Sequence, residues 1–417
     1  MEEGGGPVRD FPLAEQARKE FLAADRERIP DFSDTALTFR HLTDKRLLGT
    51  RRLFRLMGNP FLTKLLGTLG LRAVDWSLPG AKWMVRNTIY KQFVGGTDFQ
   101  DAKQSIGELA KREVDSILDY GAEGKQTAAG MDEFRDQVLL ATEFCAGTNA
   151  AIGSVVKLSG LMRFAVLESY NDKVIDFENI TDPELIQGID RLDQICRLAE
   201  ATRTEVYLDA EESWIQSAID QIAERMMARY NRERHTVFTT CQMYRHDRLA
   251  YLKALHLRSR REGFRLGLKL VRGAYMVKEN KRAATFGLRT PIQASLADTH
   301  RDFNAATEYC LEHRADIAYC VASHNEDSVV RQLRLMREHD VPRDHPNVRF
   351  SQLLGMSDNL TFNLAEHGYN VSKYMVYGPV NEVLPYLVRR AEENTSVTGE
   401  AGRELKMLDE EVRRRGL

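Results

Sequence analysis

The chain has 417 residues, of which 43% are hydrophobic and 29% charged, and its formal net charge is −2 at pH 7. That length suffices for one large hydrophobic core, and the near balance of 59 basic and 61 acidic side chains excludes the strongly basic surface typical of nucleic-acid-binding proteins. Five cysteines are scattered without a Cys-x-x-Cys motif, so we expect neither a disulfide framework nor a metal site.

Residues 1–105 are expected to form an N-terminal helical region, with amphipathic helices at 45–56 and 61–74. The segment 46–55 is basic, and two explanations stay open for it: contact with a membrane surface or, more commonly, a solvated basic face on a packed helix. No run approaches the roughly 18 apolar residues of a spanning helix, and the first residues lack the pattern of a signal peptide. We therefore expect a cytoplasmic protein, and leave open peripheral contact with the inner face of the cytoplasmic membrane.

From about residue 114, short β-branched runs alternate with helical sequence rich in Leu, Ala, Glu and Arg. Eight strands with intervening helices predict an α/β fold, a distorted (β/α)8 TIM-like barrel over residues 106–398, with residues 399–417 as a C-terminal tail. A doubly wound sheet is disfavoured because the chain has no G-x-G-x-x-G turn. The predicted strands are 116–119, 154–158, 205–209, 237–242, 266–271, 317–321, 348–353 and 372–377.

Polar residues lie at or near the ends of these otherwise apolar strands. A barrel of this type carries its active site at the carboxyl ends of the strands, and a polar side chain in a packed core is costly unless it has partners. We therefore expect this group of residues to gather in one functional site. Its members are Asp119, Lys157, Asp209, Gln242, Lys269 and Tyr377.

The segment 377–394 is expected to be a turn followed by a helix with an unusual face. Helical spacing places Tyr386, Arg389, Arg390 and Glu393 on one side, where Leu and Val are common. Two guanidinium groups offer the geometry to bind a small carboxylate in one orientation. The alternative is a solvated Arg-Arg pair bonded to Glu393.

Four motifs in this order resemble the proline dehydrogenase family over roughly residues 114–398, and in particular its single-activity, FAD-dependent members. They are Leu-Val-Arg-Gly-Ala-Tyr at 270–275, Ala-Ser-His-Asn at 322–325, Gln-Leu-Leu-Gly-Met at 352–356, and the segment 377–394. The resemblance implies a distorted (β/α)8 barrel that holds FAD at the strand ends. It also implies oxidation of L-proline to Δ1-pyrroline-5-carboxylate by hydride transfer to flavin N5, with electrons passed on to a quinone.

The resemblance assigns a role to individual residues. Lys157, Arg389 and Arg390 would bind the carboxylate of proline, and Asp209 would position Lys157 or the substrate amine. Glu123 would pair with the first arginine of the clamp at the entrance to the site. The wall of the ring pocket would consist of Ala274, Tyr275, Leu353, Tyr377 and Tyr386. The residues that would contact FAD are Gln242, Lys269, Arg272, Gly273, Ser323, His324, Asn325 and Glu393.

Two other functions stay open at this point. The first is a flavin dehydrogenase for hydroxyproline, which would need room and a polar partner beside the substrate ring; the tyrosine at 386 disfavours it. The second is a barrel that has lost catalysis and acts as a binding protein, against which the intact charged residues argue. The partners implied are L-proline and a quinone, and peripheral contact with a membrane stays open.

Overall fold

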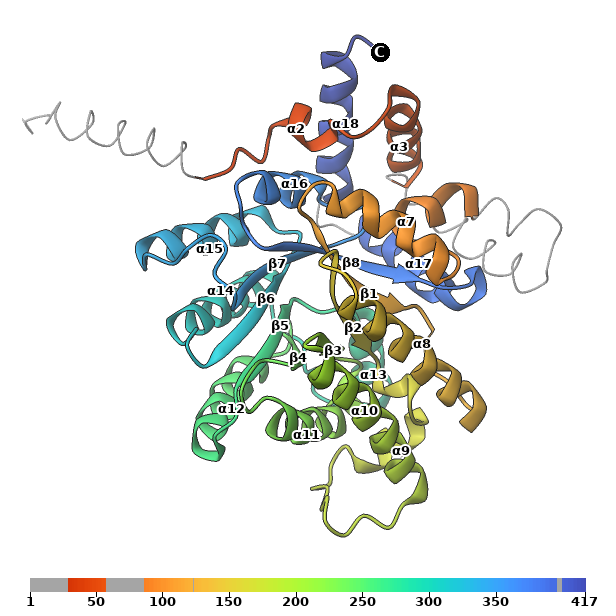
Figure 1. Ribbon diagram of the computed structural model, residues 1–417, viewed down its shortest axis with the longest axis vertical. Coiled ribbons are helices and arrows are strands. Elements are labelled where there is room, and N and C mark those ends of the chain that lie inside the picture. Colours follow the sequence, from red (N-terminus) through yellow and green to blue (C-terminus); the bar gives the residue numbers. More distant parts are fainter. Residues whose placement is uncertain (1–28, 58–85, 123, 396–399) are drawn as a thin grey trace, which may run out of the picture.

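The computed structural model describes residues 29–57, 86–122, 124–395 and 400–417. Within them, eight parallel strands form a closed barrel in which each strand pairs with its sequence neighbour and β8 closes on β1 (Figure 1). This arrangement confirms the predicted fold class. The strands are β1 (Asp115–Tyr120), β2 (Ala151–Val156), β3 (Glu205–Leu208), β4 (Val237–Gln242), β5 (Leu266–Val271), β6 (Ile317–Ala322), β7 (Val348–Leu353) and β8 (Val371–Tyr377).

Helices connect the strands and surround the barrel (Figure 1). Most connections contain one α-helix, whereas two follow β2 (α9 and α10) and two follow β5 (α13 and α14). The helices after β1 are α8 (Ala128–Ala146), the 3-10 turn η2 (Leu158–Gly160), α9 (Phe164–Tyr170), α10 (Pro183–Thr202), α11 (Ser213–Tyr230), α12 (Arg248–Glu262), α13 (Met276–Phe286), α14 (Leu296–Glu312), α15 (Glu326–Glu338), α16 (Asp358–Glu366) and α17 (Val380–Thr395).

Both faces of the strands are buried, which explains their nearly continuous apolar sequences. Alternate residues of each strand point to opposite faces. One set fills the inside of the barrel, where Ile117, Val155, Tyr207 and Phe238 form a cluster. The other set packs against the surrounding helices in the larger core.

Local signals explain where helices begin and end. At α10, the Asp182 side chain accepts hydrogen bonds from the backbone N–H groups of Glu184 and Leu185, and Pro183 occupies the first helical position. An aspartate cap followed by proline satisfies free N–H groups and preorganises the first turn. At the C-terminal end of α12, Gly263 adopts the left-handed conformation that often ends a helix.

The described parts of the N-terminal region, 29–57 and 86–105, are mainly helical, as predicted, and pack beside the barrel together with the C-terminal helix. Its elements are α2 (Thr35–Phe39), α3 (Asp44–Met57), η1 (Arg86–Tyr90), α6 (Lys91–Phe93) and α7 (Phe99–Ala110). The segment predicted as a tail contains α18 (Glu400–Arg414), which contacts α3 and α2 (Figure 1). The helix expected at 61–74 lies outside the described residues.

The contact between α3 and α18 has an apolar side and a charged side. Leu47 and Phe54 of α3 are buried in one cluster with Leu408 of α18. The basic residues Arg51 and Arg55 lie 2.5 and 3.4 Å from Oδ1 of Asp409. The basic face of α3 is therefore engaged partly by another helix of the same chain.

The boundaries of the strands agree closely with those expected from the sequence. β4, β5 and β7 have the predicted limits, whereas β2 begins at Ala151 and ends at Val156, so that Lys157 directly follows the strand. All five cysteines are buried and free. None of the helices in the described ranges combines the length and the apolar character needed to cross a membrane.

Candidate active site

Four ionisable side chains meet inside the barrel at its mouth, the end at which the strands finish. Lys157 Nζ lies 2.9 and 2.8 Å from the two carboxylate oxygens of Asp119 and 3.6 Å from Oδ2 of Asp209. Lys269 on β5 donates to Oδ1 of Asp209. Asp119, Lys157 and Lys269 are buried. Buried charges are costly unless they are paired, and here each has an opposite partner.

A tyrosine joins the two carboxyl groups of this cluster. Tyr374 Oη lies 2.8 Å from Oδ2 of Asp119 and 2.8 Å from Oδ2 of Asp209. A phenol carries a single hydrogen, so it can donate to one of these oxygens only. For both contacts to be hydrogen bonds, a second hydrogen must lie on one of the two carboxyl groups.

The surroundings of the two carboxyl groups decide which of them carries that hydrogen. Burial raises the pKa of Asp119, and the charge of Asp209 adds to the increase, against the opposing effect of Lys157. Burial would also raise the pKa of Asp209, but Lys269 and Lys157 together outweigh it and lower that pKa. Burial raises the pKa of Tyr374 well above its usual value, so the phenol stays protonated. Of the two carboxyl groups, Asp119 is therefore the one that holds a hydrogen more readily, and Asp209 the one that keeps its negative charge.

Helix α17 carries the predicted arginine pair to the same end of the barrel. The Arg389 guanidinium carbon lies 5.9 Å from the ring centre of Tyr275, which follows β5. The Arg390 guanidinium carbon lies 5.3 Å from the ring centre of Tyr386. Arg390 and Tyr386 are buried, whereas Arg389 is half-buried. The predicted helical face thus turns toward the protein.

The loop after β1 is tied to the start of α17 by an ion pair that we did not predict. Lys125 Nζ lies 3.1 Å from Oε1 of Glu382. The neighbouring Glu123, expected to pair with the first arginine, lies outside the described residues. The side chain of Glu393, expected to contact the cofactor, is likewise outside the description, although its backbone belongs to α17.

Three of the predicted wall residues lie around the cluster at the mouth of the barrel. Leu353 at the end of β7 pairs in register with Tyr374 on β8 and is half-buried. Tyr275 is buried, and Ala274 beside it is exposed. The backbone N–H of Ala274 donates to the Gln242 side chain at 3.3 Å, which connects the end of β4 to the turn after β5.

The structure corrects the role predicted for Tyr377. Its hydroxyl donates to the backbone carbonyl of Gln137 on α8 at 3.2 Å, and its ring packs on Phe99 and Tyr120. Tyr377 therefore lies outside the barrel wall, away from the charged cluster. The tyrosine of β8 that reaches the cluster is Tyr374, three positions earlier and so on the opposite face of the strand.

Arg272, just after β5, holds together the loops that follow β5 and β6. Its guanidinium donates to Nδ1 of His300 at 2.9 Å, to Oγ of Ser323 at 2.7 Å and to Oγ of Ser328 at 2.9 Å. It also lies 4.4 Å over the ring of Phe303. A cation among hydroxyl groups at the mouth of the barrel suits a negatively charged ligand such as a phosphate.

The other predicted cofactor residues are engaged in the protein itself. The Gln242 amide donates to the backbone carbonyl of Glu211 at 2.8 Å. Asn325 caps α15, because its side chain accepts a hydrogen bond from the backbone N–H of Ser328. His324 Nδ1 lies 3.0 Å from Oγ of Ser357. Burial, reinforced by nearby cations, lowers the pKa of His324 well below its usual value, so the imidazole is neutral.

The backbone of the turn after β5 requires a glycine at position 273. Its φ is 144°, a region that side chains rarely adopt, and a Cβ there would lie 2.5 Å from the ring of Tyr244. The glycine is exposed at the mouth of the barrel between Arg272 and Ala274. Lys269, Arg272 and this open backbone form a surface on which an anionic cofactor can lie.

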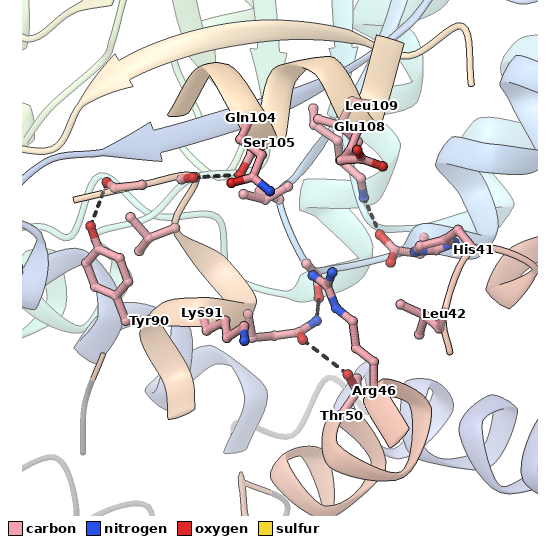
Figure 2. Close-up of a pocket in the computed structure, with 18 of the residues that line it drawn as sticks. His41, Leu42, Arg46, Thr50, Tyr90, Lys91, Gln104, Ser105, Glu108 and Leu109 are labelled. Carbon is pink, nitrogen blue, oxygen red and sulfur yellow. Dashed lines mark hydrogen bonds and ion pairs between the residues drawn. The ribbon is translucent and has the colours of Figure 1, made fainter. Parts of the chain in front are cut away.

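A hollow of about 590 Å³ lies between the N-terminal helices and the barrel (Figure 2), and its lining contains none of the residues of the charged cluster. Arg46 and Thr50 of α3 and Tyr90 line one side of it, and Ser105 and Glu108 of α7 line another (Figure 2). Lys373 reaches it from β8 and pairs with Asp358 at 2.8 Å. Near this pair, burial raises the pKa of Glu404 to about 7.

Comparisons with known proteins agree with the fold and the motifs. The family model described as "Proline dehydrogenase" matches residues 102–403. A protein named "Proline dehydrogenase 1, mitochondrial" from Dictyostelium discoideum is 30% identical over 377 residues, which cover 80% of this chain and 66% of the relative. Its namesake from Caenorhabditis elegans is 33% identical over 336 residues, covering 78% of this chain and 54% of the relative. The chain thus spans two thirds or less of the length of these relatives.

Solved structures show the same fold. A crystal structure of proline utilization A from Bdellovibrio bacteriovorus, inactivated by N-propargylglycine, superposes with a TM-score of 0.69 at 17% sequence identity. The alignment covers 92% of this chain and 41% of that chain. At this identity the likeness concerns the fold alone.

The comparisons overturn one expectation. We predicted a cytoplasmic protein, with contact at the inner face of the cytoplasmic membrane left open. The relatives from D. discoideum and C. elegans are both named as mitochondrial proteins, so that prediction is wrong. The reasoning failed because it took the absence of a recognisable leader in this sequence as an indication of compartment.

Proposed function

Since this chain belongs to the proline dehydrogenase family, we propose that it oxidises L-proline to Δ1-pyrroline-5-carboxylate with FAD as its cofactor. The observation that carries the proposal is the cluster of Asp119, Lys157, Asp209 and Tyr374, with the arginine pair of α17 at the same end of the barrel. Cations, a carboxylate and aromatic rings at one barrel mouth match the charges and the ring of an amino acid such as proline.

Arg389, Arg390 and Lys157 bind the substrate carboxylate. Guanidinium groups stay charged and bind carboxylates through paired hydrogen bonds, so two of them define both position and orientation. The ring of proline then lies against Tyr275, Tyr386, Leu353 and Ala274. Apolar contact with aromatic faces provides affinity, and the charged groups provide the orientation.

Asp209 and Tyr374 act at the substrate nitrogen. The lowered pKa of Asp209 keeps its carboxylate charged near neutral pH, where it can accept a hydrogen bond from the amine. The nitrogen must be neutral when the hydride leaves C5, because its lone pair forms the new C=N bond. Tyr374 and Asp119 hold the Asp209 carboxylate in place for this contact.

Residues at the ends of β4, β5 and β6 would hold the cofactor. Bound FAD supplies N5 as the acceptor of the hydride from C5 of proline. Lys269 and Arg272 place positive charge near the flavin ring and the pyrophosphate, which stabilises the negative charge that arrives with the hydride. The remaining contacts come from Gln242, Gly273, Ser323, His324, Asn325 and Glu393.

The electrons then pass to a quinone, which regenerates the oxidised cofactor. This step rests on the family alone, because no feature of the charged cluster selects among electron acceptors. A quinone and an artificial dye are therefore both expected to reoxidise the protein after proline has reduced it.

The visible spectrum of the purified protein tests the proposal. We expect a flavin band that bleaches when L-proline is added without oxygen, and bleaches far less with hydroxyproline. Arg390→Ala should raise the proline concentration needed for bleaching by tenfold or more, since a charge-assisted contact contributes roughly 1.5–3 kcal/mol. Arg261→Ala, on the exposed side of α12, is the matched control.

Each other outcome has a definite meaning. Preferential bleaching by hydroxyproline would keep the site and change the substrate. A protein that binds no flavin when FAD is supplied would refute the enzyme function and favour a binding protein. Equal behaviour of the Arg390 and Arg261 variants would refute the carboxylate clamp.

A further inference from the structure

The C-terminal helix α18 reaches the mouth of the barrel through two neighbouring charged residues. The Arg403 guanidinium donates to the backbone carbonyl of His324, just after β6, at 3.0 Å. The Glu404 carboxyl group accepts a hydrogen bond from the backbone N–H of Ser357, just before α16, at 2.6 Å. One helix, which the sequence suggested as a tail, therefore contacts both the loop after β6 and the loop after β7.

The backbone of Ser357 depends on its contact with α18. Ser357 is 2% exposed and its φ is 48°, in the left-handed region that residues other than glycine rarely adopt. Among the described residues, the carboxyl group of Glu404 is the one hydrogen-bond partner of the Ser357 N–H group. A buried N–H without a partner is costly, so Glu404, itself 6% exposed, stabilises the turn that precedes α16.

This turn also holds the ring of His324. Oγ of Ser357 lies 3.0 Å from Nδ1 of the imidazole. His324 is thus held at two points, the carbonyl by Arg403 and the ring by Ser357. Because Glu404 supports Ser357, both lines of contact begin in α18.

His324 lies close to both of the sites proposed above. Burial lowers the pKa of His324, and the positive charges of Lys373, Arg390, Arg403 and Arg272 add to the effect, so the imidazole is neutral. Arg390 belongs to the proposed carboxylate clamp and Arg272 to the proposed cofactor surface. With Nδ1 engaged by a serine, Nε2 is the ring nitrogen left for a ligand, and it has no hydrogen-bond partner in the part of the chain that the structure describes.

We propose that Arg403 and Glu404 are positioning residues of the cofactor site, which hold His324 and the loop after β6 in the arrangement that binds FAD. This inference rests on the proposed function, in which Ser323, His324 and Asn325 contact the cofactor. The two residues of α18 act through His324 and need no contact with FAD themselves. A loop that is ordered before binding loses less conformational freedom when the ligand arrives, and side chains behind the contacting residues provide that order.

The other side of α18 offers a matched control. Asp409 pairs with Arg51 and Arg55 of α3. This contact joins α18 to an N-terminal helix and involves neither the loop after β6 nor the loop after β7. A substitution at Asp409 therefore disturbs the same helix without removing a contact to either loop.

Equilibrium dialysis of the full-length holoprotein against graded concentrations of FAD tests the proposal, with the absorbance of the retained flavin as the readout. Arg403→Gln removes the contact with the His324 carbonyl, and Glu404→Ala removes the acceptor for Ser357. We expect each to raise the dissociation constant for FAD by about fivefold or more, the effect of losing one net hydrogen bond. Asp409→Ala should lower the urea midpoint of unfolding and leave the affinity for FAD unchanged.

Two further variants separate positioning from general stability. Glu404→Gln keeps an oxygen that can accept the hydrogen bond from Ser357, so it should restore nearly the wild-type affinity for FAD. In a His324→Ala background, Glu404→Ala should have little further effect on that affinity, because its influence passes through the imidazole. A residue that acted only through global stability would cause the same loss in both backgrounds.

The outcomes distinguish this inference from the proposed function. A wild-type protein that retains no FAD would overturn the proposed function and the inference with it. Retention of FAD by the wild type, with unchanged affinity in Arg403→Gln and Glu404→Ala, would overturn the inference alone. An equal loss of affinity in Asp409→Ala would assign α18 to global stability and overturn it as well. Arg403→Gln, at a partly exposed side chain, decides the question should Glu404→Ala fail to fold.

Discussion

Replacing Asp119 tests whether this residue carries a hydrogen in the buried cluster. In Asp119→Ala, the Lys157 ammonium loses its contacts with Asp119 at 2.9 and 2.8 Å and retains Tyr374 Oη at 3.4 Å and Oδ2 of Asp209 at 3.6 Å. Taking a partner away from a buried charge typically costs 3–5 kcal/mol, and the remaining contacts of Lys157 place the expected loss near the lower limit, about 3 kcal/mol.

Asp119→Asn should be much milder. An asparagine has a carbonyl oxygen for Lys157 and an amide that can donate to Tyr374, as the protonated carboxyl group does. It matches the protonated carboxyl group in charge, so we expect a loss of only about 1.5 kcal/mol, the lower value for a hydrogen bond to a charged group, here the Lys157 ammonium. The difference between the two variants, about 1.5 kcal/mol, corresponds to roughly a tenfold change in the unfolding equilibrium.

Urea unfolding of the protein with its cofactor, at neutral pH, measures this difference, with an unchanged slope as the control for two-state behaviour. Bleaching by L-proline should persist in the asparagine variant and be severely weakened in the alanine variant, because Lys157 then loses its two shortest contacts. If the two variants unfold at the same urea concentration, the hydrogen does not lie on Asp119 and the reasoning from the phenol contacts is wrong.

Three further predictions concern the clamp, the turn after β5 and the α18 contact. Arg390→Lys keeps the charge but loses the paired geometry, so KM for proline should rise roughly tenfold while kcat changes less; equal losses in both would contradict a role in substrate binding. Gly273→Ala should destabilise the protein by about 1–3 kcal/mol and reduce its flavin content, whereas Gly287→Ala, with φ 63° and open space around it, should show only the smaller backbone cost. Glu404 has a folded-state pKa of about 7, above its ordinary 4.5, so the stability it contributes is complete below pH 4.5 and is lost as the pH rises through 7. Glu404→Gln should therefore flatten the dependence of the unfolding midpoint on pH over this window, and an unchanged slope would show that Glu404 does not titrate there.

The site itself was only partly predictable. Lys157, Asp209 and Lys269 were found from their places at the ends of predicted strands, because parallel strands of a barrel bring their carboxyl ends together. Asp119 was noted as a strand-end residue but received no role, although it is the partner of Lys157. The ion pair between Lys125 and Glu382 joins residues more than 250 positions apart, and nothing in the local sequence of either indicates the other.

The sequence by itself determined the class of fold and the identity of the motifs. Alternation of apolar strands with amphipathic helices depends on local periodicity, which is why the limits of β4, β5 and β7 agree with the structure. The placement of Arg389 and Arg390 on one face of a helix also follows from their spacing in the sequence. Only the tertiary structure decided which tyrosine of β8 reaches the site. Tyr374 and Tyr377 are an odd number of positions apart, so they face opposite sides of the strand. The pairing of β8 with β1 and β7 determines which of these sides is the interior of the barrel.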